Sequence, residues 1–326
     1  MRYILSKLGL LVLTVWAAVT LNFLLPRLIP GSPADAAIAK LAHNGPVSPA
    51  MKSAILAQLG SPTGSLWSQY VDYLNNIVHF QFGISYTYFP ESVSTVVLAA
   101  LPWTLVLVGI TTIVSFILGT LLGALAAWKR GTVLDSVPTV AGTFLSAFPY
   151  FWIALLLLYF LGYLLNLFPT SGAYDLTATP EFTPDFLAGA AFHSVLPAVT
   201  IVLTSLGGWI LGMRSTMINT LGEDYVTFAE ANGLKPSTVA LRYAARNALL
   251  PNLTSFGLAL GGVVGGSLLV ERVFNYPGLG FLLYNAVVNQ DYPLMQALFL
   301  MITLSVLVAN FIVDVLYGVL DPRTRR

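Results

Sequence analysis

The chain has 326 residues, of which 56% are hydrophobic and only 9% are charged. Soluble domains carry about 25% charged residues, so a chain this apolar is predicted to be a membrane protein. The formal net charge of +1 excludes a partner held by bulk charge, such as nucleic acid. Because the chain has no cysteine, a disulfide framework and a thiolate metal site are excluded and the redox compartment is not encoded.

The first apolar run covers residues 8–25 and follows Arg2 and Lys7. A cleaved signal peptide is the alternative interpretation, with Ala34-Asp35-Ala36 as its cleavage site. The apolar core is longer than the roughly 7–15 residues of a signal peptide. The run therefore predicts a retained first membrane helix.

A long segment, residues 30–97, separates this helix from the rest of the chain. Ser48-Pro49 predicts the start of a short helix that Gly60 ends. A second helix is indicated by apolar residues that recur at helical spacing. These residues are Trp67, Tyr70, Val71, Leu74, Ile77 and Val78. The segment is short for a soluble domain with its own core, so we expect it to lie at the membrane interface.

Five further apolar stretches predict membrane spans. They cover residues 101–128, 138–167, 195–218, 253–270 and 294–316. The sequence thus predicts an all-α polytopic membrane protein with about six transmembrane helices. Residues 1–97 form the first transmembrane helix and outer interfacial segment, and residues 98–326 form a five-helix membrane core.

Within the spans, Gly119-x-x-x-Gly123 predicts a small-residue face for close helix packing. Pro149 is expected to kink the third span. The fifth span is rich in glycine between Gly257 and Gly266, which indicates tight packing in preference to a moving helix. Asp314, the carboxylate nearest to a span interior, is interpreted as a contact at a helix end.

Lys and Arg are unevenly divided between the two sides of this topology. Eleven of the 15 fall on the side of the N-terminus, and only Arg27, Lys40, Lys52 and Arg272 fall on the other. The positive-inside rule places both termini in the cytoplasm.

The stretch 222–251 is solvated and lies on the same side. Glu223 and Asp224 suit a helix start, Asn232-Gly233 a helix end, and Pro236 the start of a second helix. Pro251 is expected to stop that helix or to kink it into the next span. A hairpin between two spans favours docking of a partner, and an ordinary cytoplasmic loop is the alternative.

The chain has no phosphate-binding loop, no His-Glu-x-x-His pattern, and only scattered histidines (His43, His79, His193). It is therefore predicted to be no enzyme and to hold neither a metal nor ATP. Ion-driven carriers usually need buried charges in their path. Because the spans contain almost none, the energy for any transport is expected to come from a partner.

The hairpin resembles the coupling loop, called the EAA loop, of permease subunits in ATP-binding-cassette importers. The pattern is carried by Glu230-Ala231-Asn232, Gly233 and Leu250-Pro251. Permeases of the dipeptide, oligopeptide and nickel type match in more places. These are 224–226, 229–234, 246–251, FPYFW at 148–152, FPTSG at 168–172, LPAVT at 196–200, 214–217, 271–280 and 320–323.

This resemblance implies a type I importer fold and a seat for an ATPase on the hairpin. The coupling residues it implies are Asp224, Tyr225, Glu230, Ala231, Gly233, Arg242, Arg246, Asn247 and Pro251. The residues it implies for the outer gate or pathway are Glu271, Phe274, Tyr276, Pro277, Gly278 and Gly280. The implied partners are a second homologous permease subunit, two ATPase subunits that bind ATP and Mg²⁺, an extracytoplasmic solute-binding protein and membrane lipid.

The leading functional interpretation is the translocation subunit of an ATP-driven importer. A secondary ion-coupled carrier is the alternative, and a membrane-embedded enzyme is a third class that lacks a polar cluster. The resemblance suggests peptides as the solute, then oligosaccharides, then nickel.

Overall fold

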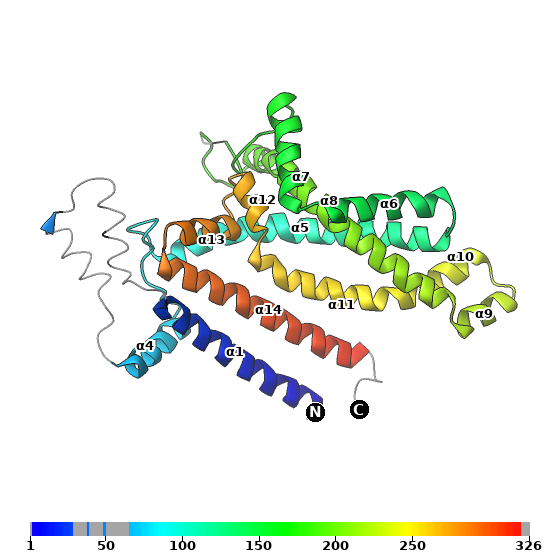
Figure 1. The fold of residues 1–326 in the computed structure, drawn as a ribbon, viewed down its shortest axis with the longest axis horizontal. Coiled ribbons are helices and arrows are strands. Elements are labelled where there is room, and N and C mark those ends of the chain that lie inside the picture. Colours follow the sequence, from blue (N-terminus) through cyan, green and yellow to red (C-terminus); the bar gives the residue numbers. More distant parts are fainter. Residues whose placement is uncertain (1, 29–37, 39–47, 50–64, 176, 321–326) are drawn as a thin grey trace.

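A computed structural model describes residues 2–28, 38, 48–49, 65–175 and 177–320. This part of the chain consists mainly of helices, several of which run along the long axis of the molecule (Figure 1). Five of them are long and apolar enough to cross a membrane, and a bent helix pair is a sixth candidate. The predicted all-α architecture of about six spans is confirmed. Residues 50–60 of the expected short helix lie outside the described residues.

The first and last spans are neighbours. α1 (Arg2–Leu28) packs along α14 (Tyr292–Leu320). Lys7 Nζ lies 2.8 Å from Asp314 Oδ2 near one end of the pair, which confirms Asp314 as a contact near a helix end. Toward the other end, Asn22 Nδ2 and Gln296 Nε2 each donate to the backbone carbonyl of the other residue, at 2.9 and 3.1 Å. α1 therefore starts, and α14 ends, on the same side of the bundle (Figure 1).

The predicted amphipathic helix is α4 (Leu66–Val78), which starts after the capping residue Ser65. Tyr70 and Tyr73 pack against Phe23 of α1, with ring centroids 5.1 and 5.4 Å apart. No residue of α4 is buried. The helix is thus attached to the end of α1 by two tyrosines.

The central pair of the bundle is α5 (Val93–Trp128) and α8 (Pro184–Leu221). A Cβ on Gly119 would collide with Trp209, and one on Gly123 would collide with Met213. The small-residue face predicted from the sequence therefore packs against α8, as expected.

Both helices begin earlier than the apolar stretches that predicted them. Ser92 caps α5 and Thr183 caps α8, each by accepting a backbone N–H of the first turn, at 3.1 and 3.3 Å. The predicted boundary at 97/98 consequently falls inside α5. Hydropathy marks the part of a helix that suits lipid, whereas capping side chains decide where the helix starts.

The third span is broken, not merely kinked. α6 (Val133–Ala147) is followed by α7 (Tyr150–Leu157) and the π-helical η1 (Leu158–Leu164), and the two parts meet at 97°. Phe148 between them is extended (φ −88°, ψ 137°). The residue before a proline is pushed out of the helical region, and Pro149 lacks an N–H, so the helix ends and a new one starts.

The hairpin and the fifth span share one helical run. After α9 (Asp224–Ala231), the segments α10 (Pro236–Thr238), η2 (Val239–Ala245) and α11 (Arg246–Gly262) follow without a gap. Pro251 lies inside α11, so of the two expectations the stop is excluded and the helix continues into the fifth span. A proline removes a single backbone hydrogen bond, and membrane helices tolerate that loss when their neighbours support them.

The glycines of α11 are packed tightly against α14, as predicted. A Cβ on Gly257 would collide with Val313, and one on Gly261 would collide with Ala309.

Beyond α11 the chain forms three short helices before the last span. These are η3 (Val263–Gly265), α12 (Leu268–Val273) and α13 (Leu279–Val288).

Candidate functional site

The hairpin lies at one end of the molecule, at the tip formed by α9 and α10 (Figure 1). Val226 and Ala229 of α9 are buried against Val239 of η2, and Leu221 packs on them. The i, i+3 spacing of the first two gives α9 one narrow apolar face. This small contact holds α9 to the chain and leaves its opposite face exposed.

A polar network fixes α9 against the second arm of the hairpin. Asn247 Nδ2 donates to the Tyr225 hydroxyl at 2.8 Å and to the Tyr243 carbonyl at 3.2 Å. The Tyr225 hydroxyl in turn donates to the same carbonyl at 3.4 Å. Two of the predicted coupling residues, Tyr225 and Asn247, are therefore in direct contact.

The turn of the hairpin depends on Gly233. Its φ is +75°, a left-handed conformation that glycine adopts without steric cost. Asn232 caps α9, and the Gly233 N–H donates to the Glu230 carbonyl at 2.9 Å. No atom would contact a Cβ at this position, so glycine is required for the conformation, as predicted.

The remaining predicted coupling residues lie on the surface. They are Asp224, Glu230, Ala231, Arg242, Arg246 and Pro251. Among the described residues, none of the four charged ones forms an ion pair. Their charges are therefore available to a partner.

Sequence reasoning missed Phe228, whose side chain is 71% exposed beside these charges. Leu241 on the second arm is 61% exposed. Val226 and Ala229 already occupy the buried face, so the side chain of Phe228 lies off it. A large exposed aromatic outside the membrane spans indicates a contact surface for another protein. The sequence carries a signal for this: Phe228 directly precedes Ala229 in the helix, so it cannot share the apolar face of Val226 and Ala229.

A second centre, around Glu271 of α12, lies well away from the hairpin, beside α7 and α13 (Figure 1). The Glu271 carboxylate is fully buried and accepts from the Thr104 hydroxyl (3.1 Å), the Phe281 N–H (3.1 Å) and the Ser267 N–H (3.4 Å). The Thr104 hydroxyl accepts from the Leu279 N–H at 2.7 Å. The Thr104 and Glu271 side chains therefore accept hydrogen bonds from N–H groups at the start of α13, and Thr104 links α13 to α5.

Glycines make room for this carboxylate. A Cβ on Gly278 would collide with the carboxylate and with the Thr104 hydroxyl, and one on Gly280 would collide with the backbone of Leu268. Both glycines predicted for the outer gate thus permit close approach of the α12–α13 turn to Glu271.

Phe274 and Tyr276 are each only 1% exposed, and Pro277 follows them in the turn. The Phe274 carbonyl accepts from the Gly172 N–H at 2.8 Å. The Tyr276 hydroxyl lies 3.1 Å from Ser194 Oγ on α8. Burial raises the pKa of Tyr276, so its hydroxyl stays protonated at neutral pH. The six residues predicted for an outer gate are gathered in one place.

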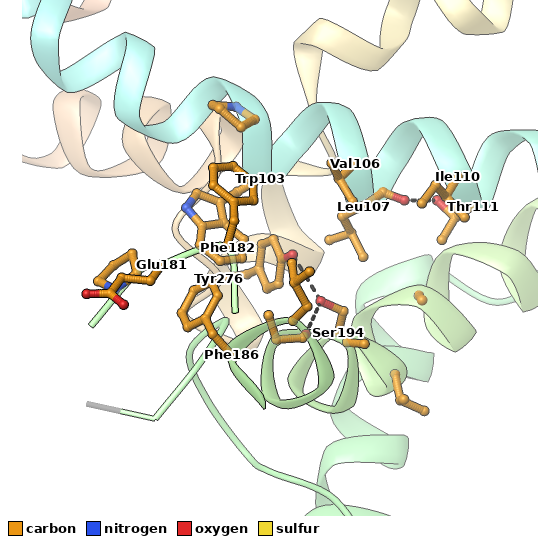
Figure 2. A pocket seen from close by; sticks show the side chains of 17 residues that line it. Trp103, Val106, Leu107, Ile110, Thr111, Glu181, Phe182, Phe186, Ser194 and Tyr276 are labelled. Carbon is orange, nitrogen blue, oxygen red and sulfur yellow. Dashed lines mark hydrogen bonds between the residues drawn. The ribbon is translucent and has the colours of Figure 1, made fainter. Parts of the chain in front are cut away.

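An apolar pocket of about 560 Å³ lies between α5 and α8 beside Tyr276 (Figure 2). Trp103 forms part of its wall and meets the Tyr276 ring edge to face, with centroids 5.9 Å apart. Phe182 and Phe186 also line it. Its few polar groups include the Ser194 hydroxyl, which is paired with Tyr276. The pocket therefore suits an apolar group, and Glu181 is the one charged residue among those that line it.

An ion pair that sequence reasoning missed joins α6 to α8. Arg214 Nε and Nη2 donate to Asp135 Oδ1 and Oδ2 at 2.6 and 3.1 Å, and the Gly131 N–H donates to Oδ2 at 3.0 Å. This two-pronged contact fixes the turn between α5 and α6 to the central helix pair. In the described part of the chain, no three His, Asp or Glu side chains are placed to hold a metal.

The model of one protein family, described as binding-protein-dependent transport system inner membrane component, matches residues 119–326. The chain belongs to this family. The match includes the hairpin, the Asp135–Arg214 pair and the turn around Glu271. Membership makes the chain a multi-pass inner membrane permease, the translocation subunit of an importer, in preference to an ion-coupled carrier.

Several relatives align over nearly their full length. The di/tripeptide transport system permease protein DppB of Pseudomonas aeruginosa is 34% identical over 100% of this chain and 99% of its own. The oligopeptide transport system permease protein AppB of Bacillus subtilis is 32% identical over 93% and 92%. The dipeptide transport system permease protein DppB of Escherichia coli K12 is 32% identical over 100% and 99%.

Proposed function

We propose that this permease carries di- or oligopeptides across the inner membrane. The observation that carries the proposal is that the relatives just described are named as peptide permeases and align from end to end. This favours peptides over oligosaccharides and nickel. The scarcity of charged side chains in the pockets agrees with a solute whose side chains vary.

The energy enters through the hairpin. Its exposed charges and Phe228 form the seat of an ATPase subunit, and ATP and Mg²⁺ are held by that partner. The excess of Lys and Arg on this side places the hairpin and both termini in the cytoplasm. Two ATPase subunits serve a pair of permeases, of which this chain is one and a homologous subunit is the other.

The side away from the hairpin faces the solute-binding protein. There the α12–α13 turn, with Glu271, Phe274, Tyr276, Pro277, Gly278 and Gly280, forms part of the outer gate. Its buried hydrogen bonds hold the turn as one rigid unit, which suits a gate that moves as a body.

Reconstitution tests the function directly. The permease pair, the ATPase subunits and the binding protein are placed in proteoliposomes, and uptake of radiolabelled trialanine is measured. We expect uptake that requires ATP inside the vesicles, is lost when the ATPase subunits are omitted, and persists when a protonophore collapses the proton gradient. Uptake that follows the gradient without ATP contradicts the proposal, and so does uptake of maltotriose in place of trialanine.

A further inference from the structure

Two helix breaks face each other beside the middle of α8. One is the α6–α7 break at Phe148-Pro149, and the other is the η3–α12 break at Gly266-Ser267. A niche of about 540 Å³ lies between them. Its lining consists of Ser146, Phe148, Pro149, Tyr150, Ile201, Thr204, Ser205, Gly266, Ser267 and Leu268.

The three serine hydroxyl groups of this niche differ from many others in the spans and from that of Thr204 in the same niche, which donates to the Thr200 and Ile201 carbonyls. Thr111, Thr200 and Thr216, for example, donate back to the carbonyl four residues earlier in their own helix. By contrast, the hydroxyls of Ser146, Ser205 and Ser267 have no partner in the described part of the chain. Three unpaired hydroxyls from three elements therefore converge on one space.

Broken backbone at membrane depth requires polar surroundings. The last carbonyls of α6 and the first N–H groups of α7 lose their helical partners at the break. Phe148 and Pro149 are exposed, so the rest of this chain does not bury the break. Such backbone is tolerated in a membrane only where it is buried in protein or lines a water-filled cavity. A hydrated niche between the two breaks satisfies this condition.

We propose that this niche is a hydrogen-bonding station for the main chain of the peptide in transit. The inference rests on the peptide-importer function proposed above. A hydroxyl both donates and accepts, so the three serines match the alternating N–H and C=O groups of an extended peptide. No charged residue lines the niche, so it does not select peptides by the charge of their side chains.

The apolar pocket beside Tyr276 is less suited to this role. Its Ser194 hydroxyl is already occupied by the Ala190 carbonyl and the Tyr276 hydroxyl. A peptide main chain that enters an apolar pocket leaves its water-bonded amides unpaired, which costs free energy. The serine niche supplies partners for the same groups.

The absence of cysteine makes a thiol test specific to the position chosen. Ser205→Cys is nearly isosteric, and it is placed in the complete importer in proteoliposomes. A water-soluble, charged methanethiosulfonate is added, and the modification of this chain is read by mass. We expect modification, and we expect trialanine with binding protein and ATP to slow it several-fold. The control is Val199→Cys on the same helix, 37% exposed and outside the niche, whose modification trialanine should not change.

Failure has distinct forms. Suppose that the wild-type importer takes up trialanine. If Ser205→Cys is then not modified, or if trialanine leaves the rate of its modification unchanged, the niche proposal is overturned and the proposed function is not. If the wild type takes up no trialanine, the proposed function fails and the peptide station fails with it. Should Ser205→Cys not assemble, Ser146→Cys on α6 carries the same test with the same outcomes.

Discussion

At the residue scale, one buried carboxylate organises a part of the bundle well away from the hairpin. Burial of a carboxylate costs several kcal/mol unless hydrogen bonds replace the water it loses. Glu271 accepts from one hydroxyl and two backbone N–H groups, and one of these belongs to the first turn of α13. A negative group at a helix N-terminus is favourable, so the same contacts satisfy the carboxylate and start the helix.

Thr104→Val tests this centre with almost no change of shape. The variant leaves the Leu279 N–H buried without an acceptor and removes the hydroxyl that donates to Glu271. An unsatisfied buried group costs about 1–3 kcal/mol, so we expect a lower melting temperature of the purified permease in detergent.

Thr112→Val is the matched control on the same helix. Its hydroxyl donates only to the Val108 carbonyl of its own helix, at 2.6 Å. Equal shifts of the melting temperature in both variants would contradict the importance of the Thr104 contacts.

The sequence indicates residues whose role depends on their own backbone, and it hides those whose role depends on a distant partner. Gly233 was predictable because Asn-Gly after a helical stretch is a common helix end. Asp135 was not, because its partner Arg214 is 79 positions away and only the fold brings them together. Glu271 was expected to belong to the outer gate, but the sequence could not show its buried hydrogen bonds, because one of them comes from Thr104 of another helix.

At the element scale, α9 is a short helix held by a small apolar contact and one polar network. Its exposed face carries Phe228, whose burial by a partner stabilises a complex by about 1.5–3 kcal/mol. We expect Phe228→Ser to weaken binding of the ATPase subunit by about tenfold or more and to reduce ATP-driven uptake, with the permease still inserted. Binding is measured by titration of purified ATPase onto permease in nanodiscs.

Phe182→Ser is the control for that experiment. Phe182 is 98% exposed but lies in the loop before α8, near the Glu271 end. If Phe228→Ser binds the ATPase with unchanged affinity, or if Phe182→Ser loses as much affinity, the proposal that α9 contacts the ATPase is contradicted.

The two prolines Pro149 and Pro251 show how much of a helix break is decided by the local sequence. Pro149 predicted a bend, but the 97° angle needed neighbours that support α7 in its new direction. Pro251 carries the same local penalty and leaves α11 intact. The local preference is similar at the two prolines, and tertiary packing decides between a break and a continuous helix.

At the scale of the whole molecule, the number of spans followed from hydropathy because the bilayer sets a minimum apolar length. Helix lengths did not follow. α5 has 36 residues and α8 has 38. At 1.5 Å per residue each is about 55 Å long, well beyond a hydrocarbon core of about 30 Å. Their polar-capped ends lie outside the apolar stretches that the prediction used.

The orientation of the whole chain is testable with two single cysteines at opposite ends. We expect Phe228→Cys to react with an impermeant maleimide only after cells are opened, and Phe182→Cys to react in intact cells. The physical reason is the excess of Lys and Arg on the hairpin side. The reverse pattern would invert the topology, and reaction of both in intact cells would contradict the span assignment.

The continuity of α10, η2 and α11 has a mechanical consequence. From Pro236 to Gly262 the backbone is helical throughout, a strut about 40 Å long. It starts at the turn that follows α9 and stops just before Gly266, where the chain passes the serine niche and reaches Glu271. Under the proposed function, a push or twist of the ATPase subunit on α9 would pass through this rigid helix to the α12–α13 turn.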